Sequence, residues 1–284
     1  MIKNAGVMGF PISHSLSPRL HGYWIEKYDL QARYLAREVK PENLENELRS
    51  LPERCLQDQE IFRGTNLTIP LKETALDLVD TLEEAARAIG AVNTVVLDDQ
   101  NNLSGRNTDW IGFMDSLSDH LDIEEFKGKT ALVLGAGGAA RAIVYACLQM
   151  GFDKILVTNR TRARAEDLCL DMGSRCEVLD WKDRDTVLKE IDLLVNSTSL
   201  GMTGQPPLEI SIAGLKEGAV VTDIVYVPLM TDLLVRAKEG DYRTVDGLGM
   251  LLHQAKAGFE AWFGVKPDVD EGLRQFVLQG LNKK

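Results

Sequence analysis

Short apolar runs alternate with stretches of helical periodicity through the first hundred residues of the chain. Apolar runs typical of buried strands lie at 5–10, 32–39 and 64–69, and stretches with helical spacing lie at 17–28, 41–51 and 72–89. Two further strands are predicted at 91–97 and 103–107, because the Asp and Asn residues of 98–102 suit a hairpin turn between them. Such alternation buries parallel strands under helices and predicts a layered α/β domain.

A second alternating series follows a predicted helix at 108–121 and a polar link at 122–129. Its strands are predicted at 130–134, 154–158, 192–196 and 219–224, and its helices at 138–150, 161–172 and 231–238. The chain then has helical spacing at 250–263 and 270–281, with a break at Pro267. The pattern predicts two α/β units and leaves the place of the last helices open.

Composition narrows the class of protein. The chain has 284 residues, which corresponds to about two domains, and 43 acidic against 32 basic residues argue against nucleic-acid binding. No run approaches the roughly 18 apolar residues of a membrane helix, and the first residues lack the basic and apolar regions of a signal peptide. We therefore expect a cytoplasmic protein without membrane association.

Cysteine and histidine spacing gives no sign of a metal site. The cysteines are Cys55, Cys147, Cys169 and Cys176, and the histidines are His14, His21, His120 and His253. The cysteines form no C-x-x-C pair and the histidines are scattered, so we expect reduced packing thiols and no metal.

Gly135, Gly137 and Ala140 fit the Gly-x-Gly-x-x-Ala pattern of dinucleotide sites, placed where a predicted strand leads into a helix. A tight turn at Gly135 requires freedom from a Cβ atom, and Gly137 lets the backbone approach a pyrophosphate. The N–H groups at the start of the following helix favour the negative charge of that pyrophosphate. A glycine-rich turn without a ligand is the alternative, but the second strand at 154–158 favours dinucleotide binding.

The residues after that second strand indicate which dinucleotide is bound. An NAD site has an Asp or Glu there for the ribose 2′-hydroxyl, whereas Thr158 is followed by Asn159, Arg160, Thr161, Arg162, Ala163 and Arg164. Guanidinium groups suit a 2′-phosphate, and Thr161 can donate a hydroxyl while capping its helix. Helical spacing would make Arg160 and Arg164 neighbours and point Arg162 elsewhere, with at least one of the three on a solvated face. We predict a preference for NADP.

The predicted first strand is followed by three serines within five residues, Ser13, Ser15 and Ser17. Ser17 before Pro18 suits a helix N-cap, and the same serines at the positive end of a helix suit a small carboxylate. Both roles can coexist, and the residues alone do not choose between them.

Lys72, Asn93 and Asp109 are polar residues whose positions ask for a reason. Lys72 falls in a predicted first helical turn, where the dipole disfavours a cation, so chemistry is one explanation. Asp109 lies at another helix start, where the dipole by itself favours an acid. Asn93 begins an apolar strand and must find partners if it is buried.

Seven motifs occur in one order along nearly the whole chain. They are Pro-Ile-Ser-His-Ser-Leu-Ser-Pro at 11–18, Asn-x-Thr-x-Pro-x-Lys at 66–72, Gly-Ala-Val-Asn-Thr at 90–94, Asn-Thr-Asp at 107–109, Gly-Ala-Gly-Gly at 135–138, Asn-Arg-Thr at 159–161 and Asp-Gly-Leu-Gly-Met at 246–250. This series resembles the shikimate dehydrogenase family. The resemblance implies a substrate-binding domain of residues 1–107 and 247–284, a Rossmann-like NADP domain of residues 108–246, and an active site in the cleft between them.

The resemblance also implies roles for individual residues. Lys72 and Asp109 resemble the catalytic pair, facing a nicotinamide across the cleft, and Ser15 and Ser17 resemble the pair that binds the substrate carboxylate. Thr68, Asn93, Tyr226 and Gln254 resemble the residues that bind the substrate hydroxyls. Lys72 and Asp109 resemble residues that also contact the substrate. The cofactor set is Gly135, Ala136, Gly137, Gly138, Ala139, Asn159, Arg160, Thr161, Arg164, Met202, Ile224 and Gly249.

The implied reaction is the reversible NADPH-dependent reduction of 3-dehydroshikimate to shikimate, in the biosynthesis of chorismate and aromatic amino acids. Two departures from the family pattern are Gly22, where the family often has Asn, and Trp110, which could reshape the rim of the cleft. Relatives that accept quinate or NAD are one alternative, and a non-catalytic NADP sensor is another. We expect a small-molecule substrate and a monomer or homodimer.

Overall fold

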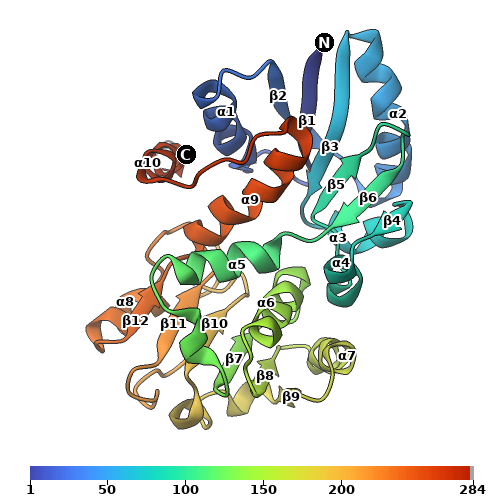
Figure 1. Ribbon diagram of the computed structural model, residues 1–284. Helices are drawn as coiled ribbons and strands as arrows, with labels where there is room; N and C mark the ends of the chain where they lie inside the picture. Colours follow the sequence, from blue (N-terminus) through green and yellow to red (C-terminus); the bar gives the residue numbers. More distant parts are fainter. Residues whose placement is uncertain (282–284) are drawn as a thin grey trace. The chain divides into compact units, whose positions relative to one another are not determined.

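The computed structural model describes residues 1–281, which form two compact units. The first unit is Met1–Thr108 together with the chain from Gln254 onward, and the second is Asp109–His253 (Figure 1). The second junction lies within α9 (Gly247–Phe263), whereas the sequence places it just before that helix.

The first unit contains a six-stranded mixed sheet with the order β2-β1-β3-β5-β6-β4. The strands are β1 (Ile2–Gly9), β2 (Ala32–Glu38), β3 (Glu60–Leu67), β4 (Thr81–Leu82), β5 (Thr94–Leu97) and β6 (Leu103–Arg106). β1 pairs in parallel with β2 and β3, and β5 and β6 form the expected antiparallel hairpin. The third strand extends over 60–67 and not 64–69 as predicted, because its first residues continue the parallel ladder with β1.

The prediction of one helical stretch at 72–89 is wrong. This segment contains α3 (Leu71–Thr74), a 3₁₀ turn (Ala75–Asp77), the short strand β4 and α4 (Glu84–Ile89). The carboxylate of Asp80 accepts hydrogen bonds from the backbone N–H of Leu103 at 2.7 Å and from Arg49 at 2.8 Å. These bonds hold the chain beside β6 in an extended path, a tertiary constraint that overrides local helical spacing.

The C-terminal helices complete the first unit. Figure 1 shows α10 (Glu271–Leu281) near α1 (Ser17–Lys27), and these two helices are in contact. The helix α2 (Leu44–Gln57) packs against β3. The indole of Trp24 donates to Asp268 O at 2.9 Å, and the indole of Trp262 donates to Val95 O at 3.0 Å. These long-range bonds and the aromatic cluster around them fix the place that the sequence pattern left open.

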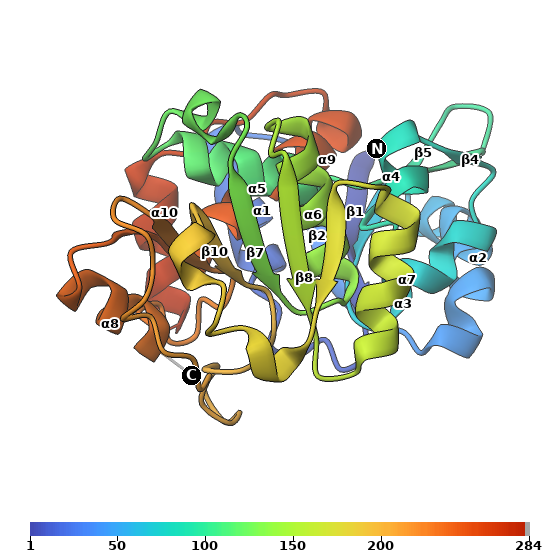
Figure 2. The same cartoon turned by 90° about the horizontal axis from the view of Figure 1, so that it is seen from below.

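The second unit contains a sheet of six parallel strands with the order β12-β11-β10-β7-β8-β9. The strands are β7 (Thr130–Leu134), β8 (Lys154–Thr158), β9 (Cys176–Leu179), β10 (Leu193–Asn196), β11 (Val220–Asp223) and β12 (Arg243–Val245). Figure 2 shows β7 and β8 side by side in this sheet. The sequence pattern misses β9 and β12, which are short edge strands with too few residues for a clear period.

Helices cover this second sheet on both faces. They are α5 (Asp109–Ser118), α6 (Gly138–Gln149), α7 (Arg162–Met172), α8 (Asp232–Glu239) and the first turns of α9. Along β7, Ala131 and Val133 belong to one buried apolar cluster, while Leu132 and Leu134 belong to another. A strand buried on both faces reads as a continuous apolar run, which is why the sequence identified it. No helix within residues 1–281 combines the length and apolar character needed to span a lipid bilayer.

Candidate active site

The loop after β1 carries the two serines expected to bind a carboxylate. α1 begins at Ser17, with Leu16 and not Ser17 at the N-cap, so the predicted capping role of Ser17 is wrong. Instead, the hydroxyl of Ser15 accepts a hydrogen bond from the backbone N–H of Ser17 at 3.3 Å. The hydroxyl of Ser17 therefore makes no capping bond, and it lowers the pKa of Tyr34 against the larger, raising effect of burial.

Thr68 and Lys72 lie just beyond the carboxyl end of β3. The backbone N–H of Thr68 donates to Met8 O at 2.9 Å, and Leu71 donates to Thr68 O at 2.8 Å. α3 has four residues, so Lys72 lies in its first and its last turn at once. The predicted conflict between Lys72 and a helix dipole therefore has no basis, because a single turn has no separate ends. The carbonyl of Lys72 accepts from the backbone of Val92 at 2.8 Å, which fixes its main chain beside Asn93.

Asn93 is the hub of a buried hydrogen-bond network in the first unit. Its side chain is 2% exposed, and its Oδ1 accepts from the backbone N–H of Thr108 at 2.8 Å. Its Nδ2 donates to the hydroxyl of Thr108 at 3.0 Å and to Gln254 Oε1 at 3.5 Å. The expectation that a buried Asn93 must find partners is confirmed. Asp109 directly follows Thr108, so the bond from Thr108 to Asn93 also restrains the main chain of Asp109. Asp109 is buried and is the first residue of α5.

Behind this hub lies a polar group that the sequence analysis did not single out. The hydroxyl of Tyr34 donates to Asn66 Oδ1 at 2.5 Å, and Asn66 Nδ2 donates to Asn93 O at 3.2 Å and to Thr94 Oγ1 at 3.1 Å. The ring of His21 stacks on that of Tyr34, with centroids 3.9 Å apart. The sequence did hold a signal, since His21 follows Ser17 by one helical turn and Asn66 is the next-to-last residue of β3.

Burial sets the protonation states of this group. Desolvation raises the pKa of Tyr34 well above its ordinary value and lowers the pKa of His21 from 6.5 to about 3. The amide of Asn66 offsets only part of the shift at His21, and neither ring nitrogen has a partner of good hydrogen-bond geometry within residues 1–281. Both rings are therefore neutral at ordinary pH.

The turn between β7 and α6 carries the glycines expected to bind a dinucleotide. Gly135 has φ +113°, its N–H donates to Thr158 O at 2.8 Å, and a Cβ atom there would lie 2.6 Å from Ser197 Oγ. Gly137 is the N-cap of α6 in extended conformation, and a Cβ there would meet nothing within 4 Å. Ala140 is fully buried and packs in the apolar core of the second unit. The turn therefore has the open backbone and the helix N-terminus that a pyrophosphate requires.

The basic segment after β8 differs from the prediction in detail. Thr161 occupies the N-cap of α7 but makes no side-chain cap bond. Arg160 precedes the helix, so the helical argument for pairing it with Arg164 does not apply. Arg162 forms ion pairs with Glu166 at 2.7 Å and with Asp180. Arg160 and Arg164 are exposed, and within residues 1–281 neither side chain makes an ion pair.

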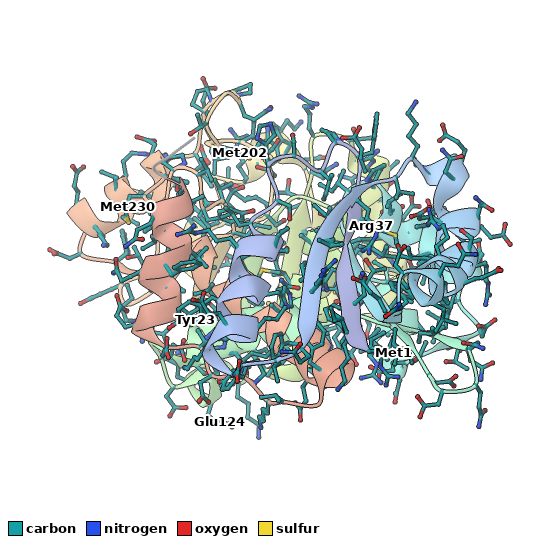
Figure 3. The ribbon with its side chains drawn as sticks, turned by 90° about the horizontal axis from the view of Figure 1, so that it is seen from above. Met1, Tyr23, Arg37, Glu124, Met202 and Met230 are labelled. Carbon is teal, nitrogen blue, oxygen red and sulfur yellow. The ribbon has the colours of Figure 1, made fainter. Side chains whose placement is uncertain are left out.

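The loops after β10 and β11 hold the remaining predicted residues. Asp223 accepts from Val225 N at 2.9 Å and from the side chains of Asn196 at 3.0 Å and Thr231 at 2.7 Å. Burial raises the pKa of Asp223 above its ordinary value despite these bonds, and burial also raises the pKa of Tyr226. Met202 is 37% exposed and is labelled in Figure 3. Asp223 thus braces the segment that contains Ile224 and Tyr226.

Gly249 has a packing reason for being glycine, besides the role near a nicotinamide that the resemblance implies. A Cβ atom at this position would lie 2.2 Å from the hydroxyl of Ser116 in α5. The close approach of α9 and α5 therefore requires a residue without a side chain at 249.

Three family models match successive parts of the chain. They are described as "Shikimate dehydrogenase substrate binding domain" over residues 7–95, "Shikimate / quinate 5-dehydrogenase" over 118–203 and "Shikimate 5'-dehydrogenase C-terminal domain" over 247–275. A relative from Paramagnetospirillum magneticum, named shikimate dehydrogenase (NADP(+)), is 50% identical over 274 residues, which cover 96% of this chain and 97% of the relative. The chain belongs to the shikimate dehydrogenase family.

Solved structures of the family share the whole fold. The shikimate 5-dehydrogenase of Thermus thermophilus, in complex with NADP(H) and shikimate, has a TM-score of 0.85 and 35% identity and covers 98% of this chain and 99% of its own. The quinate dehydrogenase of Corynebacterium glutamicum, in complex with NAD, has a TM-score of 0.87 and 28% identity and covers 98% and 99%. Both substrate types occur on this architecture, so side chains and not the fold must select between them.

The two departures from the shikimate dehydrogenase pattern have local explanations. A Cβ atom at Gly22 would meet nothing within 4 Å, so glycine is not required there by packing. Trp110 packs edge-on against Tyr145 of α6, with ring centroids 5.3 Å apart. Trp110 thus stabilises the packing of α5 on α6 inside the second unit.

Proposed function

We propose that this protein is an NADP-dependent shikimate dehydrogenase that reversibly reduces 3-dehydroshikimate to shikimate, a step of chorismate and aromatic amino-acid biosynthesis. It is an oxidoreductase acting on a CH–OH group. The observation that carries this proposal is the 50% identity to a shikimate dehydrogenase (NADP(+)) over 96% of the chain. The intact turn at Gly135 and the hydrogen-bonded setting of Asn93 support it.

For the substrate, we propose two groups of contacts. Ser15 and Ser17 bind the carboxylate, which the freed Ser17 hydroxyl and the start of α1 support. Thr68, Asn93, Tyr226 and Gln254 bind the ring hydroxyls. The amide of Asn93 is held rigid by Thr108, so an ordered partner can meet it without loss of side-chain freedom.

For the chemistry, Lys72 holds the proton that the reduced carbonyl oxygen receives. Its ammonium group stabilises negative charge as it develops on that oxygen and then transfers the proton, acting as electrostatic stabiliser and general acid. Asp109 orients Lys72 and accepts a hydrogen bond from a substrate hydroxyl. The backbone anchors of both residues converge on the segment of Asn93, which supports a shared role.

For the cofactor, the residues present fit NADP, which supplies the hydride when bound. Residues 135–139 hold the pyrophosphate on the open turn, and Asn159, Arg160, Thr161 and Arg164 hold the 2′-phosphate. Met202, Ile224 and Gly249 border the nicotinamide. The exposed guanidinium groups of Arg160 and Arg164 support the preference for NADP, since no carboxylate of residues 1–281 is paired with them.

The deciding experiment measures initial rates on shikimate and on quinate, each with NADP and with NAD. We expect the highest kcat/KM for shikimate with NADP. A preference for quinate with NAD would make the protein a quinate dehydrogenase, and nucleotide binding without turnover would make it a sensor.

We further propose that the protein works in the cytoplasm as a monomer or homodimer. All 4 cysteines are free and buried, as is usual for proteins of reducing compartments. Analytical ultracentrifugation at micromolar concentration gives the oligomeric state directly, and a higher assembly would contradict this proposal.

A further inference from the structure

Two cysteines meet at one edge of the second unit. Cys169 lies in the last part of α7, and Cys176 is the first residue of the edge strand β9. Both belong to one buried apolar cluster, and the thiol of each is the largest influence on the pKa of the other. Cys55 and Cys147 are also buried, but within the described residues the thiol of neither is hydrogen-bonded to another cysteine.

The backbone, and not only side-chain packing, keeps the two thiols together. The N–H of Gly173 donates to Cys169 O at 3.1 Å, and the N–H of Cys176 donates to Gly173 O at 3.0 Å. Gly173 has φ +89°, which permits the sharp reversal between helix and strand. The short connection leaves little freedom for the sulfurs to separate.

The pair lies just beneath the surface. Cys169 and Cys176 are each 8% exposed, whereas residues 173–175 of the connecting turn are all exposed. A Cβ atom at Gly173 would meet nothing within 4 Å, so the turn is open to solvent at this position. A small oxidant therefore reaches the sulfurs after a local opening of the turn, without unfolding of the sheet.

The interaction between the two thiols also distinguishes them. Cys176 lowers the pKa of the Cys169 thiol, whereas Cys169 and burial raise the pKa of the Cys176 thiol. Since the thiolate is the nucleophile, Cys169 attacks first and Cys176 acts second.

We propose that Cys169 and Cys176 form a reversible dithiol–disulfide site that reacts with small hydroperoxides. The Cys169 thiolate attacks one peroxide oxygen, the O–O bond breaks and hydroxide leaves, which gives a sulfenic acid. Cys176 then attacks the sulfur of Cys169, the S–O bond breaks, and water leaves as the S–S bond forms. Overall, two thiols and one hydrogen peroxide give one disulfide and two waters, and a dithiol reductant restores the thiols by exchange.

The chemical consequence is protection of this edge from irreversible oxidation. A sulfenic acid beside a second thiol condenses before it can be oxidised further. The cross-link also ties the end of α7 to β9, which pairs with β8 through Ile155 and Cys176. Oxidation therefore stabilises the sheet edge that carries the segment after β8.

The test uses the full-length protein with equimolar hydrogen peroxide, followed by alkylation in denaturant and peptide mass spectrometry. We expect a peptide pair linked through Cys169 and Cys176, two alkylated cysteines among the 4 free ones, and full recovery of thiols with dithiothreitol. The midpoint of thermal unfolding should rise by about 5 °C in the oxidised protein, as a closed loop of this length predicts.

Single variants separate the two roles. Cys176→Ser should accumulate a sulfenic acid at Cys169 that a dimedone probe captures, whereas Cys169→Ser should yield no such product at position 176 at the same dose. Cys147→Ser and Cys55→Ser are matched buried controls and should still form the disulfide. The proposal is overturned if all 4 thiols survive, or if Cys169 reacts no faster than Cys55 and Cys147.

Discussion

At the scale of single residues, the network around Asn93 is built on amides and hydroxyls that satisfy one another. Asn93 and Asn66 are buried, with exposures of 2% and 6%, and their bonds run from Tyr34 to Thr108. A buried network of this kind rigidifies its members, because a broken link leaves an unsatisfied polar group. The bond from Val92 reaches Lys72 at its main-chain carbonyl, so a change of the Lys72 side chain leaves that bond in place.

Replacing Lys72 therefore tests chemistry more than stability. Lys72→Met should lower kcat by about 10²–10⁴-fold, because the proton donor is lost, and should leave the KM for NADPH nearly unchanged. Steady-state kinetics with both substrates varied measures the two constants. Lys266→Met, at an exposed position, is the control and should retain full activity. Near-normal turnover by the Lys72→Met variant would contradict the role of Lys72.

Acid sensitivity should originate in part at His21. The folded state holds the pKa of His21 at about 3, below the ordinary 6.5, so the unfolded chain takes up the proton first. Stability is therefore lost as pH falls from 6.5 towards 3, and this residue should remove about 2 kcal/mol between pH 7.5 and pH 5.

Urea unfolding at the two pH values measures that loss. His21→Phe keeps an aromatic ring stacked on Tyr34 and should show a smaller loss on acidification than the parent protein. His120→Gln changes an exposed histidine and should leave the loss as it is. Equal losses in the parent and His21→Phe would show that His21 does not titrate in this way.

At the scale of elements, the strand–turn–helix unit at β7 and α6 follows directly from sequence. The apolar run predicted β7 at 130–134, and the glycine pattern predicted the turn, because both are local properties of consecutive residues. The 72–89 segment failed for the opposite reason, since Asp80 bonds to Arg49 and to the backbone of Leu103, residues far away in the chain. Edge strands β9 and β12 were missed because a ladder partner, and not an internal period, defines them.

The two glycines of the turn should respond differently to alanine. Gly135→Ala places a Cβ 2.6 Å from Ser197 Oγ at φ +113°, so we expect a loss of stability. The loss should be about 1–3 kcal/mol, typical of backbone strain. Gly137 has φ −95° and open space, so Gly137→Ala should keep its stability but raise the KM for NADPH.

Thermal unfolding measures the stability of each variant, and steady-state kinetics measures its KM for NADPH. If Gly137→Ala binds NADPH as tightly as the parent protein, the pyrophosphate does not approach this backbone.

The preference for NADP over NAD should depend on Arg164, in the segment after β8. Arg164→Gln should lower kcat/KM for NADP more than for NAD, because a 2′-phosphate loses a charged donor. Arg162→Gln is the matched control, since Arg162 is bound to Glu166 and Asp180, and it should leave the ratio of the two values unchanged. An equal fall with both cofactors would place Arg164 away from the 2′-phosphate.

At the scale of the whole molecule, the first unit is discontinuous in sequence. Its sheet is complete by residue 106, yet α9 and α10 supply much of its aromatic core. Trp262 is 1% exposed and donates to Val95 O across 167 residues of chain. This bond and the buried indole join α9 to β5, so the packing of the C-terminal helix on the sheet depends on Trp262.

Trp262 should therefore be a strong determinant of global stability. Trp262→Ala should lower the free energy of unfolding by about 3–5 kcal/mol, through a large cavity and an unpaired carbonyl at Val95. Trp262→Phe fills most of the space and should lose only part of that amount. Guanidinium chloride unfolding measures both variants. If the two lose the same amount, the hydrogen bond and not the packed volume dominates.

The sequence by itself determined the α/β class, the dinucleotide turn, the order of the motifs and the family, because each depends on neighbouring residues or on their spacing. Tertiary structure alone decided that Leu16 and not Ser17 occupies the N-cap of α1, that β4 interrupts a helical pattern, and that Tyr34, Asn66 and His21 lie together behind Asn93. It also brought Cys169 against Cys176 through the backbone of Gly173. These features arise from hydrogen bonds and packing between residues that the chain brings together only when it folds, so no local pattern encodes them.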